Sequence, residues 1–244
     1  MRRPKKISNT SICSMKALYL IPARGGSKGI PGKNIKLLNQ KPLINYSIDV
    51  ARALTSDENI CVSTDDAEII KVVSDHGLKV PFVRPPELAT DNAGSYEVCL
   101  HALDFYAAAG IEYDVLVLLQ PTSPFRTPQQ VNEAMSLYHR DLQMVVGVKE
   151  TASNPYYVLF EENAEGYLVK SKTGNFIGRQ NCPKVWEYNG AIYIINVKEL
   201  RKYSLSDFRK VKKYVMDEFT SVDIDTPLDW DWAEFLLERG MIKF

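Results

Sequence analysis

The segment that decides the fold follows the short apolar run 17–21 and reads Ile21-Pro22-Ala23-Arg24-Gly25-Gly26-Ser27-Lys28-Gly29-Ile30-Pro31-Gly32-Lys33-Asn34. Its glycines let the backbone approach a ligand closely and expose N–H groups, while its lysines and arginine can neutralise phosphate oxygens. Such a loop directly after a buried strand favours a nucleotide phosphate site over a flexible basic loop without a ligand.

The loop matches neither of two common phosphate-binding motifs. Ser27 stands where the Walker pattern needs its first glycine, and Asn34 replaces the final serine or threonine. Its glycines also do not have the G-x-G-x-x-G spacing of a dinucleotide site. The loop therefore indicates phosphate binding of another kind.

Outward from this loop, short apolar runs alternate with helical patterns, which is typical of βαβ units. We expect strands at 17–21, 59–63, 79–83, 114–119, 144–148 and 191–197. We expect helices that begin at Pro42, at a cap formed by Thr64 or Asp65, at a Ser95 cap, at Pro128 and at Thr226, the last closed by Gly240. The predicted fold class is α/β, with a Rossmann-like, mostly parallel sheet flanked by helices. The run 114–119 is the most apolar and predicts a central strand, so the Gln120 loop would lie where open sheets bind ligands.

The alternation breaks between Thr151 and about Tyr188. Runs 156–160 and 167–169 flank a Glu-Glu-Asn-Ala-Glu-Gly turn and predict a small inserted hairpin subdomain, of the kind that serves as a lid or dimer contact. We divide the chain into a polar tail, 1–15, and a single α/β domain, 16–244, which carries the insertion at about 151–188. Met15 offers an alternative translation start.

Composition excludes several classes of protein. The 244 residues hold 30 Lys+Arg and 30 Asp+Glu, so no overall field would attract nucleic acid or an anionic membrane. The charge is segregated locally, because residues 1–48 carry ten basic side chains and no acid, whereas 214–238 carry eight acids and no Lys or Arg. No apolar run approaches the roughly 20 residues of a membrane span. Four scattered cysteines indicate neither disulfides nor zinc, so we expect a cytoplasmic protein.

Two carboxylates near the C-terminus form a candidate metal site. In Val222-Asp223-Ile224-Asp225 the acids lie at i and i+2, so on a strand both would point to one face. Two carboxylates with phosphate oxygens and water suit Mg²⁺, although Asp225 alone could simply support the start of the last helix. The remaining acids of that helix are expected on its solvated face: Asp229, Asp231, Glu234 and Glu238.

Six short motifs, taken in order, resemble the N-acylneuraminate cytidylyltransferases, or CMP-sialic acid synthetases, from about Lys16 to the C-terminus. They are the loop RGGSKGIPxKN, S-T-D-D (63–66), R-P-x-x-L-A-x-D (84–91), L-L-Q-P-T-S-P-F-R (118–126), N-G-A-I-Y (189–193) and V-D-I-D (222–225). The resemblance implies an enzyme that joins CTP and a nine-carbon α-keto acid sugar, a nonulosonic acid, to give a CMP-sugar and pyrophosphate. It also implies Mg²⁺ and a homodimer.

The resemblance assigns roles residue by residue. Triphosphate contacts fall to Arg24, Ser27, Lys28 and Lys33, with Lys33 stabilising charge at the α-phosphate. Cytidine contacts fall to Asn34, Arg84, Ala93 and Ser95, where Ala93 replaces a hydroxyl residue often found in the family. Sugar contacts fall to Gln120, Arg179, Tyr188 and Asn189. Arg24, Lys33 and Arg179 would be catalytic, with Arg179 meeting the sugar carboxylate or the phosphates, and Asp223 and Asp225 would hold the metal.

Other functions compete with this interpretation. A cytidylyltransferase for the eight-carbon acid Kdo usually has R-x-x-S-x-R-L-P-G-K-P in its loop, which Lys28-Gly29-Ile30 and Asn34 disfavour. A nucleotide-binding protein without turnover would not need Lys33, Asp223 and Asp225 together. An RNA-binding module is disfavoured because the basic stretch lacks interleaved aromatics.

Overall fold

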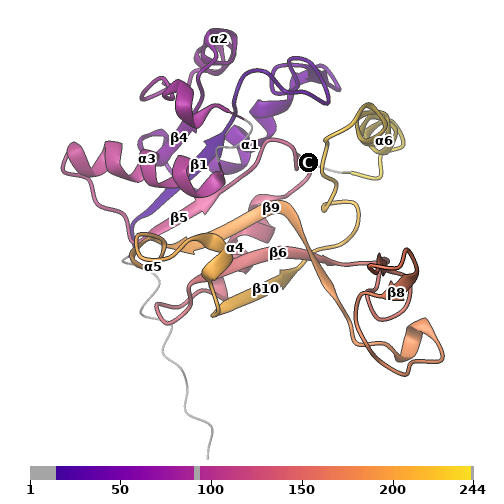
Figure 1. The fold of residues 1–244 in the computed structure, drawn as a ribbon. Helices are drawn as coiled ribbons and strands as arrows, with labels where there is room; N and C mark the ends of the chain where they lie inside the picture. The colour runs from indigo at the N-terminus through magenta and orange to yellow at the C-terminus, as the bar shows by residue number, and fades with distance from the viewer. Residues whose placement is uncertain (1–14, 91–93, 243–244) are drawn as a thin grey trace, which may run out of the picture.

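The computed structural model describes residues 15–90 and 94–242, in which six strands form one sheet in the order β10-β6-β9-β5-β1-β4 (Figure 1). All neighbouring strands are parallel except that β9 runs antiparallel to both β5 and β6. The predicted α/β class with a mostly parallel sheet is confirmed, and β5 is an interior strand as expected. The strands span β1 (Ala17–Pro22), β4 (Ile60–Ser63), β5 (Val115–Leu118), β6 (Met144–Glu150), β9 (Trp186–Asn196) and β10 (Val211–Val215).

Helices cover both faces of the sheet because strand side chains alternate between two apolar cores. Tyr19 and Ile21 of β1 pack with α1 (Leu43–Arg52), α2 (Ala67–Asp75) and α4 (Pro128–Ser136). On the other face, Leu18 and Leu20 pack with α3 (Ser95–Ala108) and α5 (Val197–Leu200). No helix among residues 15–90 and 94–242 is long and apolar enough to cross a membrane.

A third apolar cluster attaches the C-terminal helix α6 (Pro227–Glu238) to the loop 21–34. Trp230 and Leu236 of α6 are buried in it together with Ile30 of the loop. Burying one such aliphatic side chain contributes about 1.5–3 kcal/mol. Leu38 of the small hairpin β2 (Leu37–Leu38) and β3 (Lys41–Pro42) lies in the same cluster. The acidic segment before α6 is thereby held beside the basic loop.

The insertion contains a short hairpin, as predicted, formed by β7 (Phe160–Glu162) and β8 (Leu168–Lys170). In Figure 1 it projects away from the sheet where β6 ends and β9 begins. The first strand starts later than the predicted 156–160, because Tyr157 N–H and Val158 N–H both donate to Asn154 O and close a turn there. A 3₁₀ turn, η4 (Arg179–Asn181), follows before β9.

Three local predictions were wrong. The strand expected at 79–83 is absent apart from one bridge between Thr64 and Val83, since Pro81 has no N–H to donate. The cap of α2 is Asp66, whose carboxylate accepts from Glu68 N–H and Ile69 N–H, and not Thr64 or Asp65. The N-cap of α3 is Gly94, so Ser95 is the first helical residue and does not cap.

The strand β10 was not predicted from the sequence. Its sequence, Val-Lys-Lys-Tyr-Val, is half polar because β10 is an edge strand that pairs only with β6. Short 3₁₀ turns complete the chain at η2 (Asp57–Asn59), η3 (Pro86–Leu88) and η5 (Leu205–Asp207).

Candidate active site

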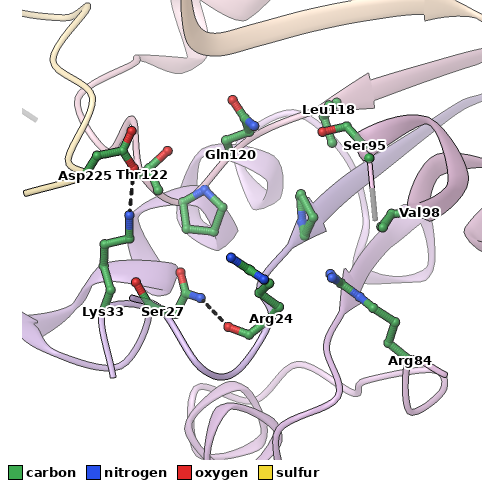
Figure 2. A pocket seen from close by; sticks show the side chains of 14 residues that line it. Arg24, Ser27, Lys33, Arg84, Ser95, Val98, Leu118, Gln120, Thr122 and Asp225 are labelled. Carbon is green, nitrogen blue, oxygen red and sulfur yellow. Dashed lines mark hydrogen bonds and ion pairs between the residues drawn. The ribbon is translucent and has the colours of Figure 1, made fainter. Parts of the chain in front are cut away.

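A pocket of about 260 Å³ opens where β1 and β5 end, beside the first turn of α3 (Figure 2). Its lining comes from five stretches of the chain, 22–34, 84, 94–98, 118–122 and 225. Eight of the lining residues are predicted site residues: Arg24, Ser27, Lys33, Asn34, Arg84, Ser95, Gln120 and Asp225. Figure 2 shows Lys33 and Asp225 at one end of the pocket and Arg84, Ser95 and Val98 at the other, with Arg24 between them. The pocket therefore has two chemically different ends.

The glycine-rich loop is held at both of its ends. Asn34 closes it, since its Nδ2 donates to Arg24 O over 3.1 Å and its carbonyl accepts from Ile44 N–H at the start of α1. Asp65, from the Ser-Thr-Asp-Asp motif, accepts a hydrogen bond from Gly25 N–H at 2.9 Å. The loop is thus fixed in a defined shape at the exit of β1.

Lys33 joins the basic loop to the acidic segment. Its side chain is only 9% exposed, and its Nζ donates to Ile224 O at 2.7 Å and to Asp225 Oδ1 at 2.9 Å. An ammonium group has three N–H donors. One donor of Lys33 therefore remains for an oxygen in the pocket while the two protein contacts persist.

Gly29 and Asp229 fix the main chain of Asp225. A Cβ at Gly29 would lie 2.1 Å from Asp225 O, so only glycine allows this approach. Asp229 Oδ2 accepts from Asp225 N–H at 3.1 Å and from Thr226 N–H at 2.7 Å, completing a capping box with Thr226. Asp229 is therefore the N3 residue of the capping box of α6, a structural role in addition to its expected place on the solvated face.

The acidic pair alternates as predicted but does not lie in a strand. Val222 and Ile224 are buried, whereas Asp223 and Asp225 are exposed residues. The segment is extended but lies beyond β10, and Ile224 N–H donates to Thr122 O at 2.8 Å. Tertiary contacts, and not the hydrogen bonds of a β-strand, hold the segment 222–225 in place.

The two carboxylates have different environments. The Asp225 side chain is 70% exposed, while the Asp223 carboxylate turns towards the hydroxyls of Thr122 and Ser123, with Ser123 Oγ 3.3 Å from Oδ1. Desolvation there raises the pKa of Asp223. Among the described residues no third His, Cys, Asp or Glu joins them as a metal ligand. Two carboxylates suit Mg²⁺ when phosphate oxygens and waters supply the remaining ligands.

The opposite end of the pocket is built around a buried arginine. Arg84 donates through Nε to Ser63 Oγ at 3.0 Å, through Nη2 to Ser63 O, and through Nη1 to Leu88 O at 3.5 Å. Burial lowers its pKa, although Asp65 acts in the opposite sense. Ser95 lies at the N-terminus of α3, where unpaired N–H groups favour polar or anionic ligand atoms.

Of the two sugar-site candidates on β9, Asn189 has a buried side chain and Tyr188 has an exposed one. The Asn189 side chain points into the protein, where Nδ2 donates to Ser221 Oγ at 2.9 Å and to Met216 Sδ at 3.1 Å, and Oδ1 accepts from Ala191 N–H. The Asn189 side chain therefore does not point towards a sugar site. Tyr188 is half exposed and meets Tyr193 edge-on at 6.2 Å between ring centroids.

Three further candidates among the described residues do not line the pocket, namely Lys28, Arg179 and Asp223. Lys28 is exposed on the glycine-rich loop, and Arg179 is exposed on η4 of the insertion. Ala93 falls outside the described residues, as does the tail up to residue 14. Sequence reasoning missed Ser123 and Gly190, which flank Gln120 and Asp223, although the Pro-Thr-Ser-Pro and Asn-Gly motifs that contain them signalled turns.

Comparisons with known proteins agree with this arrangement. A CMP-N,N'-diacetyllegionaminic acid synthase from Legionella pneumophila is 34% identical over 226 residues, covering 92% of this chain and 97% of the relative. An N-acylneuraminate cytidylyltransferase from Escherichia coli is 36% identical over 89% of this chain and 51% of its own length. A pseudaminic acid cytidylyltransferase from Campylobacter jejuni is 31% identical over 91% of this chain and 96% of its own.

Among solved structures, a CMP-2-keto-3-deoxy-manno-octonic acid synthetase complexed with CTP has a TM-score of 0.68 at 20% identity, covering 92% of this chain and 99% of that chain. This likeness shows a shared fold. The profile described as cytidylyltransferase matches residues 18–229, most of the chain. On the profile match and the identity to full-length relatives, the chain belongs to the cytidylyltransferase family.

Proposed function

We propose that the protein transfers CMP from CTP to the anomeric hydroxyl of a nonulosonic acid, a nine-carbon α-keto acid sugar, and releases pyrophosphate. The observation that carries this proposal is the two-ended pocket, with Lys33 and Asp225 at one end and Arg84 and Ser95 at the other. Relatives that match nearly all of this chain are named as legionaminic and pseudaminic acid enzymes, which supports the substrate class.

The reaction forms one P–O bond and breaks another. The anomeric oxygen attacks the α-phosphorus, the bond to the β-phosphate bridge breaks, and the hydroxyl proton is released. Such a transfer needs alignment and charge neutralisation more than covalent help from the protein. In this proposal Arg24, Ser27 and Lys28 bind the triphosphate, and the remaining N–H of Lys33 donates to an α-phosphate oxygen.

The cytidine would occupy the end of the pocket at Arg84 and Ser95. Arg84 is held by Ser63 and Leu88, so its guanidinium is rigid and can read a base edge without losing much rotamer entropy on binding. Asn34, whose side chain closes the loop, lines the same pocket. The acceptor sugar would lie towards Gln120 and Tyr188.

Asp223 and Asp225 would hold Mg²⁺ together with triphosphate oxygens. A magnesium ion at this position supplies charge neutralisation for the phosphates and the leaving pyrophosphate. Thr122 hydrogen-bonds to the Asp223 carboxylate through its side chain, and Gly29 allows Asp225 to lie close to the loop. The donor set fits a hard cation that keeps several non-protein oxygen ligands.

The insertion would form a homodimer contact. Its apolar side chains are unusually exposed, with Leu168 70% and Ile177 96% accessible. Residues of this kind on a projecting hairpin support burial against a second copy. A second copy would also place Arg179 in a different environment from the exposed position that it has in one chain.

The test is pyrophosphate release with each of the four nucleoside triphosphates against a panel of eight- and nine-carbon α-keto acid sugars, with and without Mg²⁺. We expect release only with CTP, a nonulosonic acid and Mg²⁺ together. Release with Kdo and none with nine-carbon acids would favour the Kdo alternative, and no release under any condition would refute turnover.

A further inference from the structure

Arg126 is a fully buried arginine whose hydrogen-bond acceptors are all neutral. Its Nε donates to Ala191 O at 2.8 Å, and its Nη1 donates to Ser123 O at 2.8 Å. Nη2 donates to Gln120 O, and both terminal nitrogens donate to Ser47 Oγ, at 3.0 and 3.2 Å. The guanidinium therefore binds three carbonyls from two chain segments, the loop after β5 and the strand β9.

An uncompensated buried charge is costly, and apolar side chains of similar volume are often as stabilising as a buried ionic group. The desolvation at this site lowers the pKa of Arg126 to about 9, with Asp223 as the opposing influence. Stability alone therefore gives little reason for an arginine here. Its planar fork, which fixes several acceptors at once, gives a geometric reason.

The carbonyls that Arg126 binds belong to residues around the acceptor side of the pocket. The Gln120 side chain lines the pocket, and Ser123 Oγ donates to Asn189 O at 3.0 Å and lies 3.3 Å from Asp223 Oδ1. Ala191 directly follows Gly190. One buried group thus connects Gln120 and Ser123 with the turn at Gly190.

Gly190 provides the space on which these side chains converge. Its φ of +72° is a left-handed conformation that favours glycine, and the β6–β9 register shifts at this point of the strand. A Cβ there would lie 2.8 Å from Ser123 Oγ, 2.9 Å from Gln120 Oε1 and 3.5 Å from Asp223 Oδ2. An amide, a hydroxyl and a carboxylate therefore meet over a single glycine.

We propose that Arg126 is a positioning residue for the transfer reaction: its fork clamps the loop 120–123 against Ala191, so that Gln120 and Asp223 converge over Gly190 at the acceptor side of the pocket. This inference rests on the proposed function. It assigns Arg126 no contact with substrate, because the side chain is enclosed by Ser47 and the three carbonyls.

The test compares Arg126→Lys, which keeps the charge but loses the fork, with Arg126→Met, which loses both. We expect kcat to fall by about 100-fold, the typical result of a misplacement of about 1 Å at a reacting centre. The Kd for CTP, measured by calorimetry without Mg²⁺ so that the Asp223 carboxylate does not contribute, should stay within about threefold of the wild type, since Lys33 and Arg84 are held by other contacts. A weaker CTP affinity with unchanged kcat would overturn the proposal.

Arg52→Met is the matched control. Arg52 binds Asp57 and His76 O at the surface, so its loss removes comparable hydrogen bonds away from the pocket. If Arg126 has a purely structural role, Arg126→Lys and Arg126→Met should both lower Tm and keep the wild-type kcat per folded molecule. That result would also overturn the positioning role.

Two further experiments distinguish a failure of this inference from a failure of the proposed function. Wild-type protein that releases no pyrophosphate refutes the proposed function, and crystal structures of wild-type and Arg126→Lys protein then decide the inference alone. Displaced Gln120 and Asp223 side chains support it, whereas superimposable ones overturn it. If neither arginine variant folds, Gly190→Ala tests the same convergence from the other side, and wild-type kcat in that variant overturns the proposal.

Discussion

Lys33 and Asp225 form an ion pair of 2.9 Å between Nζ and Oδ1, although 192 positions separate them in the chain. The pair joins the basic N-terminal segment to the acidic C-terminal segment, so the neutral overall charge conceals two opposed fields that meet at one pocket. The lysine side chain is buried and the aspartate is mostly exposed. The buried partner is therefore preorganised, while the exposed one can accept an additional cation.

Replacing Lys33 by methionine should lower kcat/KM for CTP by about 100-fold or more, because a preorganised charge at a phosphate typically contributes this much. Lys36→Met is the control, since Lys36 lies 4.1 Å above the Trp230 ring outside the pocket lining. It should lose at most about 1 kcal/mol of unfolding free energy and keep its turnover. Steady-state kinetics and urea unfolding measure both; equal losses of activity would contradict the assignment.

Asp225→Asn should abolish turnover while the protein stays folded. The carboxylate is 70% exposed, so its loss costs little stability, whereas the proposed metal site loses a ligand and Lys33 loses its ionic partner. Pyrophosphate release across a Mg²⁺ titration, with Tm measured in parallel, checks this expectation. Undiminished activity at low Mg²⁺ would refute the metal role.

Gly29→Ala should reduce turnover severely, because its Cβ would lie 2.1 Å from Asp225 O and force the loop and the acidic segment apart. Gly110→Ala is the control: Gly110 has a φ of +75° but no atom within 4 Å of a Cβ, so it suffers backbone strain alone. We expect Gly110→Ala to lose about 1–2 kcal/mol of stability and to keep its kcat. Equal kcat values for both variants would show that the Gly29–Asp225 approach is dispensable.

Leu168→Glu combined with Ile177→Glu should convert a dimer into a monomer in light scattering. Both side chains lie exposed on the insertion, and charge there opposes burial against a second copy. Leu228→Glu on α6, where the leucine is 76% exposed, should leave the mass unchanged. A wild-type protein that is monomeric at working concentration would contradict the dimer outright.

The thiols of Cys61 and Cys99 should resist modification in the native protein. Both are buried, and this burial raises the pKa of each thiol from 9.0 to about 12. Because the folded pKa lies above the unfolded one, the stability that these thiols contribute is present below pH 9 and is lost as the pH rises from 9 towards 12. Timed reaction with a disulfide reagent at pH 8 should modify the half-buried Cys182 before Cys61 and Cys99. Rapid reaction of Cys61 or Cys99 in folded protein would refute their burial.

The buried strands of the sheet could be predicted from their apolar runs. The run 114–119 is apolar on both faces because β5 is covered by helices on both sides, and that pattern survives in the sequence. The edge strand β10 could not be predicted in this way, since one pairing partner and partial exposure leave it with two lysines and no apolar run.

The pocket end at Lys33 could be predicted because a glycine-rich basic loop has a distinctive composition. The side at Gln120 could not, because it depends on a backbone irregularity: the register shift in β9 turns Asn189 inward and places Gly190 close to Gln120. No residue pattern indicates whether the asparagine side chain of an Asn-Gly pair points into the protein or towards a ligand. The contacts of Arg126 could not be predicted either, because three of its acceptors are main-chain carbonyls, which the sequence does not specify.

The insertion leaves the sheet from β6 and returns through β9, and these strands are direct neighbours, paired at Val148 with Tyr188 and at Glu150 with Trp186. Its two ends are therefore already held together by the ladder, and lengthening it adds only loop-closure entropy, about 0.6 kcal/mol for each doubling. Segments of different length and shape can therefore be exchanged at this point without disturbing the six-stranded sheet. The fold lets the insertion vary while the strand ends that form the pocket stay fixed.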